Sequence, residues 1–298
     1  MTDLSFSTHV AVVTGAGRGI GRAHALLLAS RGAAVVVNDT GGAVDGSLNG
    51  EHPAHDVVAE IVSAGGHAVA STASVATADG AQSIVDTAIS AFGRIDAVIN
   101  NAGIYSVKSW LDVPLAEFQS FIDVHFMGSL LVSRAAWPHL IESRRGRIVN
   151  TVSGAMLGVP DMVHYGSAKG AIFGLTRNLA VAGAAHGIKV NAIAPAAGTR
   201  MLEEATGALP PGTVEYMKQT MPPELVAPVA AYLAHESCSI TGEVLNVAGG
   251  MVSRLAVGST AGIADSDLTP ETVAERLGEI LAVDNLTPAP LMLPSGEA

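Results

Sequence analysis

The sequence predicts an α/β fold, with one doubly wound parallel sheet and helices on both of its faces. Three observations lead to this fold class. Short runs of valine, isoleucine and alanine alternate with longer helical stretches. A glycine-rich turn follows the first apolar run, and an acidic residue follows the second. Unbroken apolar strands separated by helices are typical of parallel sheets covered on both faces, and right-handed connections between them give the doubly wound arrangement.

The expected strands and helices alternate along the chain. Runs such as VAVVT, AVVVN and AVIN are short, apolar and β-branched, which favours strands, whereas the longer stretches between them favour helices. We expect strands at 10–14, 34–38, 67–71, 97–100, 147–152, 189–193 and 244–247. We expect helices at 19–31, 57–64, 82–92, 115–142 and 165–186.

Two segments do not follow this alternation of strands and helices. Residues 40–55 are polar and glycine-rich, which indicates a long loop after the second strand. Residues 251–298 follow the predicted domain of residues 1–250 as an extension with one helix near 270–282. Thr269 suits the cap of that helix, and Pro270 suits its first turn. We interpret the extension as a partner-covering or frayed segment rather than a second domain.

Composition restricts the class of protein. The apolar stretches among the 298 residues end before the roughly 18–20 residues that a bilayer span needs, and no secretory signal begins the chain. The only cysteine is Cys238, so no intrachain disulfide forms, which suits the cytoplasm. A net charge of −11 argues against nucleic acid as a partner, and the ten histidines show no metal-ligand spacing. These features predict a soluble enzyme-sized protein without a metal.

The glycine-rich turn predicts a dinucleotide site. It reads Gly15-Ala16-Gly17-Arg18-Gly19-Ile20-Gly21 and lies between a strand and a helix. Glycine lets the backbone approach a pyrophosphate closely, and the helix start offers free N–H groups and partial positive charge. A lone turn of this kind is weak evidence, but here Asp39 ends the second strand at the expected distance.

Asp39 and Arg18 indicate different cofactors. A carboxylate at the end of the second strand accepts hydrogen bonds from the adenosine ribose hydroxyls and repels a 2′-phosphate, which favours NAD. Arg18, inside the glycine turn, favours a 2′-phosphate, unless it is simply solvated or contacts the pyrophosphate. We give Asp39 the greater weight and expect NAD.

Tyr165 and Lys169 are the candidate catalytic pair. A spacing of four residues places both side chains on one face of a helix. A free tyrosine has a pKa of about 10, and a nearby ammonium group is expected to lower it, so that the phenol takes a proton from an alcohol. Ser153, at the end of the preceding strand, is expected to hydrogen-bond the substrate oxygen, with Thr151 a weaker candidate.

The motifs TGAGRGIG, NNAG and YGSAK, in this order, resemble the short-chain dehydrogenase/reductase superfamily over residues 10–250. The resemblance implies a single Rossmann-type domain, a Ser153–Tyr165–Lys169 catalytic set and a homodimer or homotetramer. Ser153 precedes the tyrosine by one residue less than is usual, which a deletion in the intervening loop explains. His125 occupies the position of the usual relay asparagine, where it either supports a water or backbone contact or is a buried, hydrogen-bonded histidine.

The resemblance also implies further cofactor contacts. Ser74 and Val75 follow the third strand, where Ser74 replaces part of an aspartate contact to adenine that Ala73 lacks. Thr199, after the turn at Pro195, is expected to hold the nicotinamide carboxamide. The full set of residues expected at the cofactor comprises Gly15, Arg18, Gly19, Ile20, Gly21, Asp39, Ser74, Val75, Asn101, Ala102, Gly103, Tyr165, Lys169, Pro195 and Thr199.

Several other stretches, among them RGAAVVVNDTGG and SRAAWPHL, are similar to one branch of this superfamily. That branch is the (3R)-hydroxyacyl-CoA dehydrogenase part of peroxisomal multifunctional enzyme type 2, also called 17β-hydroxysteroid dehydrogenase type 4, and its bacterial single-domain relatives. The similarity implies NAD-dependent oxidation of a 3-hydroxyacyl-CoA or a hydroxysteroid. The methionine-containing segment 202–221 is a candidate substrate lid, or an ordinary packed helix and loop.

Two alternatives accompany this hypothesis. Arg18 would suit an NADPH-dependent carbonyl reductase. A catalytically idle nucleotide-binding regulator would need the cofactor groove but not Tyr165 and Lys169. Glycine and alanine recur along the predicted helix 165–186, where they allow close approach either to a partner subunit or to the chain's own sheet.

Overall fold

A computed structural model describes residues 4–47, 50–204 and 212–293 of the chain. Within these residues eight strands form one sheet in the order β3-β2-β1-β4-β5-β6-β7-β8. The strands β1 to β7 run parallel, which confirms the predicted fold class. The strands are β1 Val10–Thr14, β2 Ala34–Asn38, β3 His67–Ser71, β4 Ala97–Asn100, β5 Arg147–Thr151, β6 Lys189–Ala196, β7 Val244–Ala248 and β8 Met251–Leu255.

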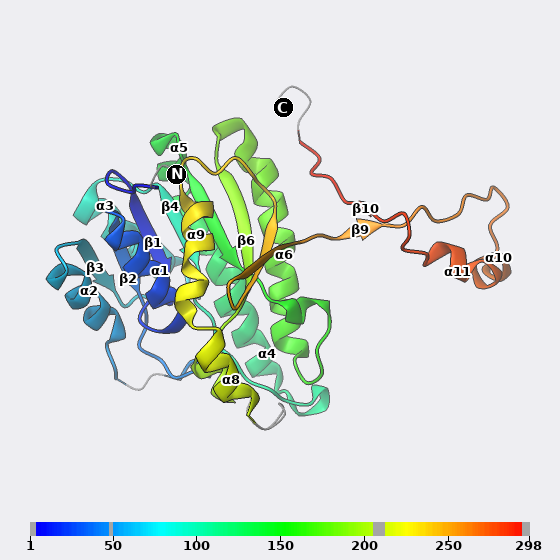
Figure 1. Cartoon of the computed structure of the whole chain (residues 1–298), viewed down its shortest axis with the longest axis horizontal. Helices are drawn as coiled ribbons and strands as arrows, with labels where there is room; N and C mark the ends of the chain where they lie inside the picture. Colours follow the sequence, from blue (N-terminus) through cyan, green and yellow to red (C-terminus); the bar gives the residue numbers. More distant parts are fainter. Residues whose placement is uncertain (1–3, 48–49, 205–211, 294–298) are drawn as a thin grey trace.

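Helices cover both faces of the sheet (Figure 1). On one face α1, α2 and α9 pack together, and on the other face α3, α5 and α6 do so. The helices are α1 Gly19–Ser30, α2 Pro53–Ser63, α3 Ala78–Phe92, α4 Leu115–Phe121, α5 Gly128–Ser143, α6 Val163–Gly183, α7 Arg200–Glu204, α8 Thr213–Thr220 and α9 Ala227–Ala234.

The strand β1 shows how the core divides into two layers. Successive side chains of a strand point to opposite faces of the sheet. Ala11 and Val13 therefore pack in the cluster beneath α1, whereas Val10 and Val12 pack in the cluster beneath α3. All four are buried, so no polar alternation marks the strand. Because β1 lies between β2 and β4, the strand order reverses beside it, and the carboxyl edge there is where such sheets hold ligands.

The sheet contains one strand, β8, that the sequence did not predict. After β7 the chain turns at Gly249 and Gly250, both with positive φ (54° and 82°), and returns as β8, antiparallel to β7. Two glycines with positive φ suit a tight hairpin turn. The side chains of β8 are largely exposed, so this edge strand lacks the apolar run of the other strands. Its five residues were assigned to the extension but belong to the main sheet.

The expected helix at 115–142 is interrupted. A π-helical segment, Ile122–Met127, separates α4 from α5 and contains His125. Such segments insert an extra residue into the helical ladder and often occur at functional sites. The helices α2 and α3 each begin four residues before their predicted starts, at Pro53 and Ala78, and Thr77 caps α3 by accepting a hydrogen bond from the Gly80 N–H.

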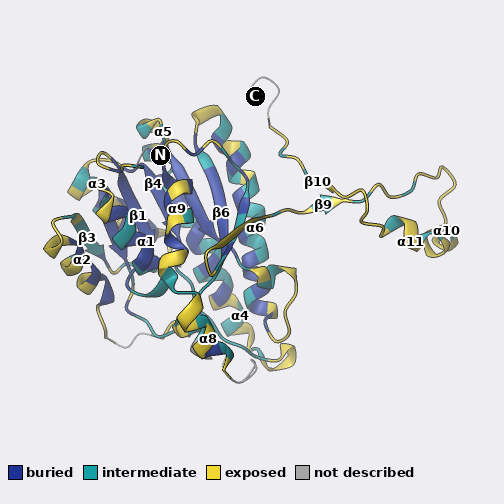
Figure 2. Ribbon diagram, viewed as in Figure 1, coloured by how far each residue is buried: buried dark blue, intermediate teal, exposed yellow. Residues whose placement is uncertain are grey.

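The extension leaves the main domain as an arm (Figure 1). Two short strands, β9 Gly258–Ser259 and β10 Thr287–Pro288, pair antiparallel at its base. The single helix expected at 270–282 is two short helices, α10 Pro270–Glu275 and α11 Leu277–Ile280, because the chain leaves helical geometry at Arg276. Thr269 caps α10 as expected. Most of the arm is exposed (Figure 2). Its exposed residues include several large apolar ones, such as Leu281 and Val283.

In the described part of the chain no helix combines the length and the apolar character that a membrane span requires.

Candidate active site

A cavity of about 780 Å³ opens at the carboxyl edge of the sheet, beside the strand-order reversal. It brings together residues from the glycine turn, the ends of β2 to β6, the π-helical segment and the start of α6. The predicted site residues that line it are Gly15, Arg18, Gly19, Ile20, Asp39, Ser74, Val75, Asn101, Ala102, Gly103, His125, Tyr165, Lys169, Pro195 and Thr199. Gly21 and Ser153 are not in its lining.

Gly21 lies behind the cavity because it serves the packing of the turn. A Cβ atom added to Gly21 would lie 2.1 Å from the carbonyl oxygen of Gly15, and one added to Gly15 would lie 2.7 Å from Cα of Ala102. Gly15 also has a φ of +61°, a conformation that favours glycine. Glycine is therefore required here for close backbone contact between the first turn and the loop after β4.

Thr14 joins these two turns, and sequence reasoning missed it. Its hydroxyl oxygen accepts hydrogen bonds from the N–H groups of Asn101 (3.0 Å) and Ala102 (3.1 Å). The Asn101 amide in turn donates to the carbonyl oxygens of Thr14 and Gly15, both at 3.0 Å. The signal was its position as the last residue of the first strand, immediately before the glycine turn.

A buried polar network supports the floor of the site. The Asn100 amide donates to the Asn150 side-chain oxygen (2.8 Å) and to the Ser133 hydroxyl (2.9 Å). The Asn150 amide donates to the Thr176 hydroxyl at 3.0 Å. These bonds link β4 and β5 to α5 and α6. Hydrogen bonds of this kind favour one arrangement of the elements that carry the site, although the Asn100 side-chain oxygen is buried without a partner among the described residues.

Both oxygens of Asp39 are held by backbone N–H groups. Oδ2 accepts from Gly17 at 3.0 Å and Oδ1 accepts from Gly41 at 2.8 Å, which fixes the carboxylate at the cavity wall. Arg18 forms an ion pair with Glu51 and donates to the Gly42 carbonyl at 3.4 Å. The loop after β2 therefore folds back over the glycine turn, and its own carboxylate balances the charge of Arg18.

Tyr165 and Lys169 line the other end of the cavity, and Ser153 lies beside Tyr165 just behind the lining. Tyr165 lies in the first turn of α6, and the Lys169 Nζ lies 5.5 Å from the centre of its ring. Nζ donates a hydrogen bond to the Thr151 carbonyl at 2.8 Å. Ser153 hydrogen-bonds the Tyr165 side chain and also accepts from the Ala155 N–H at 3.2 Å, as the cap of a 3₁₀ turn. Ser153 thus caps this turn in addition to contacting Tyr165.

The expected lowering of the tyrosine pKa does not occur in the protein chain itself. Burial raises the pKa of Tyr165 to about 12, and the hydrogen bond with Ser153 opposes this only in part. Burial also lowers the pKa of Lys169 to about 7. Lys169 is buried and Tyr165 is partly buried at the cavity wall, and removal of a charged form from water outweighs the attraction expected between ammonium and phenolate. The pair therefore rests as a neutral phenol beside an amine that titrates near neutrality.

His125 is buried and holds the backbone beside the cavity. Its Nε2 lies 2.9 Å from the carbonyl oxygen of Ile104 and 3.2 Å from the N–H of the same residue. Its ring lies edge-on to Tyr165, with ring centres 5.4 Å apart. Burial, with the nearby Lys169, lowers the pKa of His125 well below its usual value, so the ring is neutral. His125 is therefore both a buried, hydrogen-bonded histidine and in contact with the backbone, as either expectation required, and its neutral imidazole lies next to the Tyr165 phenol.

The turn at Pro195 is described throughout, whereas the candidate lid is described only in part. Pro195 and Thr199 line the cavity together with Met201, Leu202 and Met217. Of the candidate lid at 202–221, residues 205–211 lie outside the described residues. Tyr105, which no sequence pattern indicated, also lines the cavity, and its ring lies edge-on to Tyr165 with centres 5.4 Å apart.

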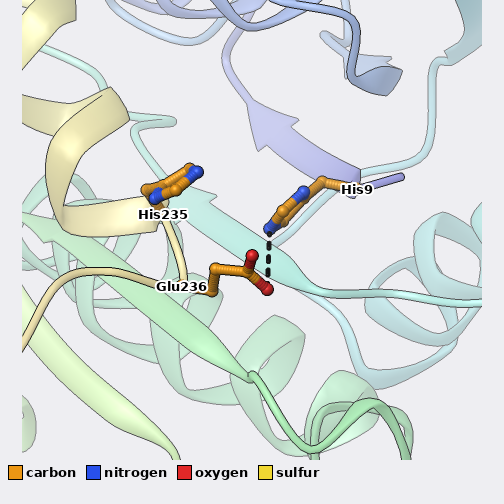
Figure 3. A group of neighbouring side chains, drawn as sticks. All are labelled: His9, His235 and Glu236. Carbon is orange, nitrogen blue, oxygen red and sulfur yellow. Dashed lines mark ion pairs between the residues drawn. The ribbon is translucent and has the colours of Figure 1, made fainter. Parts of the chain in front are cut away.

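One group of histidines is clustered, contrary to the expectation that all are scattered. His9, His235 and Glu236 place one potential ligand atom each within 4.8 Å of the others (Figure 3). The nitrogens of His235 are already engaged, Nδ1 by the Ser237 N–H (3.1 Å) and Nε2 by the Ser5 carbonyl (3.0 Å). Glu236 pairs with Arg145 at 3.2 Å. The group lies at the amino edge of the sheet, because His9 immediately precedes β1.

Comparison with known proteins agrees with this geometry. A family model described as short chain dehydrogenase matches residues 9–208. The chain is a short-chain dehydrogenase/reductase. Rv0148 of Mycobacterium tuberculosis, by its name a short-chain type dehydrogenase/reductase, is 44% identical over 273 residues, which cover 91% of this chain and 93% of the relative. The predicted family is therefore confirmed.

Two solved structures are also similar. Full-length peroxisomal multifunctional enzyme type 2 from Drosophila melanogaster shares 32% identity with a TM-score of 0.78; the match covers 96% of this chain and 48% of that one. A 7α-hydroxysteroid dehydrogenase complexed with NADH and 7-oxo glycochenodeoxycholic acid shares 30% identity with a TM-score of 0.73, over 84% of this chain and 98% of that one. The chain thus spans about half of the multifunctional enzyme.

Proposed function

We propose that this chain is an NAD-dependent oxidoreductase that interconverts a secondary alcohol and a ketone. The observation that carries the proposal is a cavity with Tyr165 and Lys169 at one end, where Ser153 lies beside Tyr165, and the glycine turn with Asp39 at the other end. Bound NAD would supply the ring that accepts or returns a hydride. Turnover of a secondary alcohol with NADH formation, lost in Tyr165→Phe, is the direct test.

The catalytic residues have separate roles in this proposal. Tyr165 exchanges a proton with the substrate oxygen at its hydroxyl, and Ser153 hydrogen-bonds the same oxygen. With a pKa raised to about 12, Tyr165 rests as a proton donor, which suits ketone reduction in the chain as it stands. Lys169, with a pKa of about 7, exchanges protons near neutral pH and orients the site through the Thr151 carbonyl. His125 keeps the adjoining backbone in place.

NAD rather than NADP is proposed on the basis of Asp39. Its carboxylate is held rigidly at the cavity wall by two N–H donors and would face a 2′-phosphate with like charge. The ion pair between Arg18 and Glu51 reduces the positive charge available nearby. Dissociation constants for both cofactors, measured by quenching of intrinsic fluorescence, test this point. Tighter binding of NADP would contradict it and support the NADPH-dependent carbonyl reductase.

The proposed substrate is a 3-hydroxyacyl-CoA or a hydroxysteroid-like alcohol. The resemblance to the multifunctional-enzyme branch supports the first, and the similar 7α-hydroxysteroid dehydrogenase structure supports the second. Met201, Leu202 and Met217 supply adaptable apolar surface at the cavity wall. NADH formation with 3-hydroxyacyl-CoAs of several lengths and with hydroxysteroids would identify the class. No turnover with any secondary alcohol would instead favour the idle nucleotide-binding regulator.

We also propose a homodimer or homotetramer, with the extension covering a partner subunit. In α6 the small residues divide into two groups. Gly166 and Gly183 pack against the chain's own backbone, where an added Cβ would lie 2.6 Å from Ala155 O and 2.8 Å from Ile188 O. An added Cβ at Gly174 would meet no atom within 4 Å, so this position is open to a second copy. The exposed apolar side chains of the arm support the same proposal.

Light scattering would test association. Truncation after Leu255 removes the arm but keeps the whole main sheet. An oligomer that becomes smaller or dissociates on truncation would support a partner-covering role. An unchanged mass would support the frayed alternative.

A further inference from the structure

Tyr105 occupies the wall of the catalytic end of the cavity. It comes two residues after the NNAG motif, in a loop between β4 and α4. Its ring meets the Tyr165 ring edge to face, at 5.4 Å between centres and an interplanar angle of 79°. Two phenols therefore lie side by side where the reacting carbon of a substrate must be placed, and the proposed mechanism uses only one of them.

The backbone around Tyr105 is held at three successive residues. His125 contacts both the N–H and the carbonyl of Ile104. The N–H of Tyr105 itself donates to the Val44 carbonyl at 2.9 Å. Ser106 donates its hydroxyl to Glu117 at 2.6 Å and contacts Nε2 of His164 at 2.9 Å. Such anchoring fixes the backbone that carries the Tyr105 ring beside Tyr165, as a group that positions a ligand requires.

The contact between Ser106 and His164 connects the Tyr105 loop to the start of α6. His164 is fully buried and directly precedes Tyr165 at the start of α6. Glu117 is also paired with Lys108, so one cluster fixes both the Tyr105 loop and the first turn of α6. The relative placement of the two phenols is thus set by shared hydrogen bonds.

The hydroxyl of Tyr105 is available to a ligand. Within residues 4–47, 50–204 and 212–293, no hydrogen bond engages this hydroxyl. Burial raises the pKa of Tyr105 above its ordinary value, so the group stays protonated and can donate. A negative charge on Tyr105 would raise the pKa of Tyr165, which places the two phenols within electrostatic range of one another.

We propose that Tyr105 is a specificity-determining residue, whose hydroxyl donates a hydrogen bond to a second substrate oxygen beside the reacting alcohol. In the proposed mechanism Tyr165 and Ser153 contact the reacting oxygen, whereas Tyr105, whose ring contacts that of Tyr165, reaches an oxygen on a nearby carbon that does not react. A 3-hydroxyacyl thioester carries such an oxygen two carbons from the reacting carbon. This inference rests on the proposed function and selects the acyl thioester over a simple alcohol.

The test compares Tyr105→Phe with the parent on two substrates of equal chain length, a 3-hydroxyacyl-CoA and a secondary alcohol without the carbonyl. Loss of one neutral hydrogen bond should lower kcat/KM for the thioester by about 3- to 10-fold. The value for the simple alcohol, and the dissociation constant for NAD, should not change. Tyr232→Phe, on α9 at the other face of the sheet, is the matched control and should change none of them.

Two outcomes would overturn the inference: equal values of kcat/KM for parent and Tyr105→Phe on the thioester, or an equal loss on both substrates. If the parent turns over neither substrate, the proposed function fails, and binding then decides the role of Tyr105. Calorimetry with a 3-oxoacyl-CoA should show about 3- to 10-fold weaker binding to Tyr105→Phe. Equal binding, or no binding to the parent, would refute it.

Discussion

The two edges of the sheet both collect ionisable side chains, but they do so differently. At the carboxyl edge Tyr165, Lys169 and Asp39 line a cavity of about 780 Å³. At the amino edge His9, His235 and Glu236 lie with their potential ligand atoms within 4.8 Å of one another (Figure 3). However, Glu236 is paired with Arg145, and backbone groups engage the ring nitrogens of His235. Proximity alone therefore does not make a site. The carboxyl edge differs because its ionisable groups face a cavity at the strand-order reversal.

The largest expected effect tests the chemistry at the carboxyl edge. Tyr165→Phe removes the proton-exchanging hydroxyl but keeps the ring that packs against Tyr105 and His125. We expect kcat to fall by about 10²- to 10⁴-fold, with NAD binding retained. Steady-state kinetics and fluorescence titration measure the two quantities. Activity near the parent level would remove Tyr165 from the proposed mechanism.

The next largest effect tests whether the ionisable groups at the amino edge stabilise the fold rather than form a site. Asp96 is fully buried and accepts hydrogen bonds from the Val10 N–H (2.9 Å), Arg94 (2.7 Å) and Arg145 (2.9 Å). Burial opposes its ionisation, but these donors keep its pKa below the ordinary value. Asp96→Ala leaves buried N–H donors without a partner and should lower the free energy of unfolding by about 3–5 kcal/mol.

Urea denaturation measures that loss. Glu236→Gln is the matched control, because Glu236 is half exposed and pairs with the same arginine. It should cost less than about 1 kcal/mol. Specific activity per folded molecule should be unchanged in both variants. A large loss of activity in a folded Asp96→Ala protein would contradict the division between the two edges.

Acidification should lower the free energy of unfolding through two buried histidines, His24 and His9. Burial lowers the pKa of His24 to about 3, and that of His9 to about 4, from about 6.5 in the unfolded chain. Between pH 6.5 and these values the unfolded state binds protons that the native state does not. Stability therefore falls as pH falls, by up to about 1.4 kcal/mol per pH unit for each histidine.

The unfolding free energy measured from pH 7 to pH 4 checks this slope. His24→Leu replaces a buried ring that has no hydrogen-bond partner within the described residues. The variant should show a shallower dependence on pH, whatever its stability at pH 7. An unchanged slope would exclude His24 as a contributor.

A smaller effect is expected from the ion pair beside Asp39. Glu51→Gln removes the partner that balances Arg18, so Arg18 should attract a 2′-phosphate more strongly. Because the pair is partly exposed, we expect NADP binding to improve by only about 2- to 5-fold relative to NAD. Glu60→Gln, which breaks the neighbouring pair with Arg22, is the control and should leave the ratio unchanged.

The smallest effect concerns metal at the amino edge. Because His235 and Glu236 are already engaged, we expect neither Zn²⁺ nor a chelator to change the melting temperature. Differential scanning calorimetry checks this. Stabilisation by Zn²⁺ that disappears in His9→Ala would make the cluster a metal site after all.

The sequence was most informative where function depends on local geometry. The glycine turn, Asp39 and the Tyr165–Lys169 spacing were recognisable because a turn, a strand end and a helical face each span only a few residues. The structure places all of them around one cavity. The strand β8 was missed because its exposed edge position leaves no apolar pattern, and α2 and α3 were placed late because their caps lie in polar segments.

The sequence by itself thus determined the fold class, the family and the positions of the main motifs, since these follow from local patterns of glycine, apolar and β-branched residues. Tertiary structure alone decided which distant groups meet. Thr14 joins two turns that are far apart in sequence, and Tyr105 reaches Tyr165 through a loop without periodic pattern. It also decided the direction in which the pKa values of Tyr165 and Lys169 shift, because burial depends on everything packed around a group and outweighs the spacing between two residues on one helix.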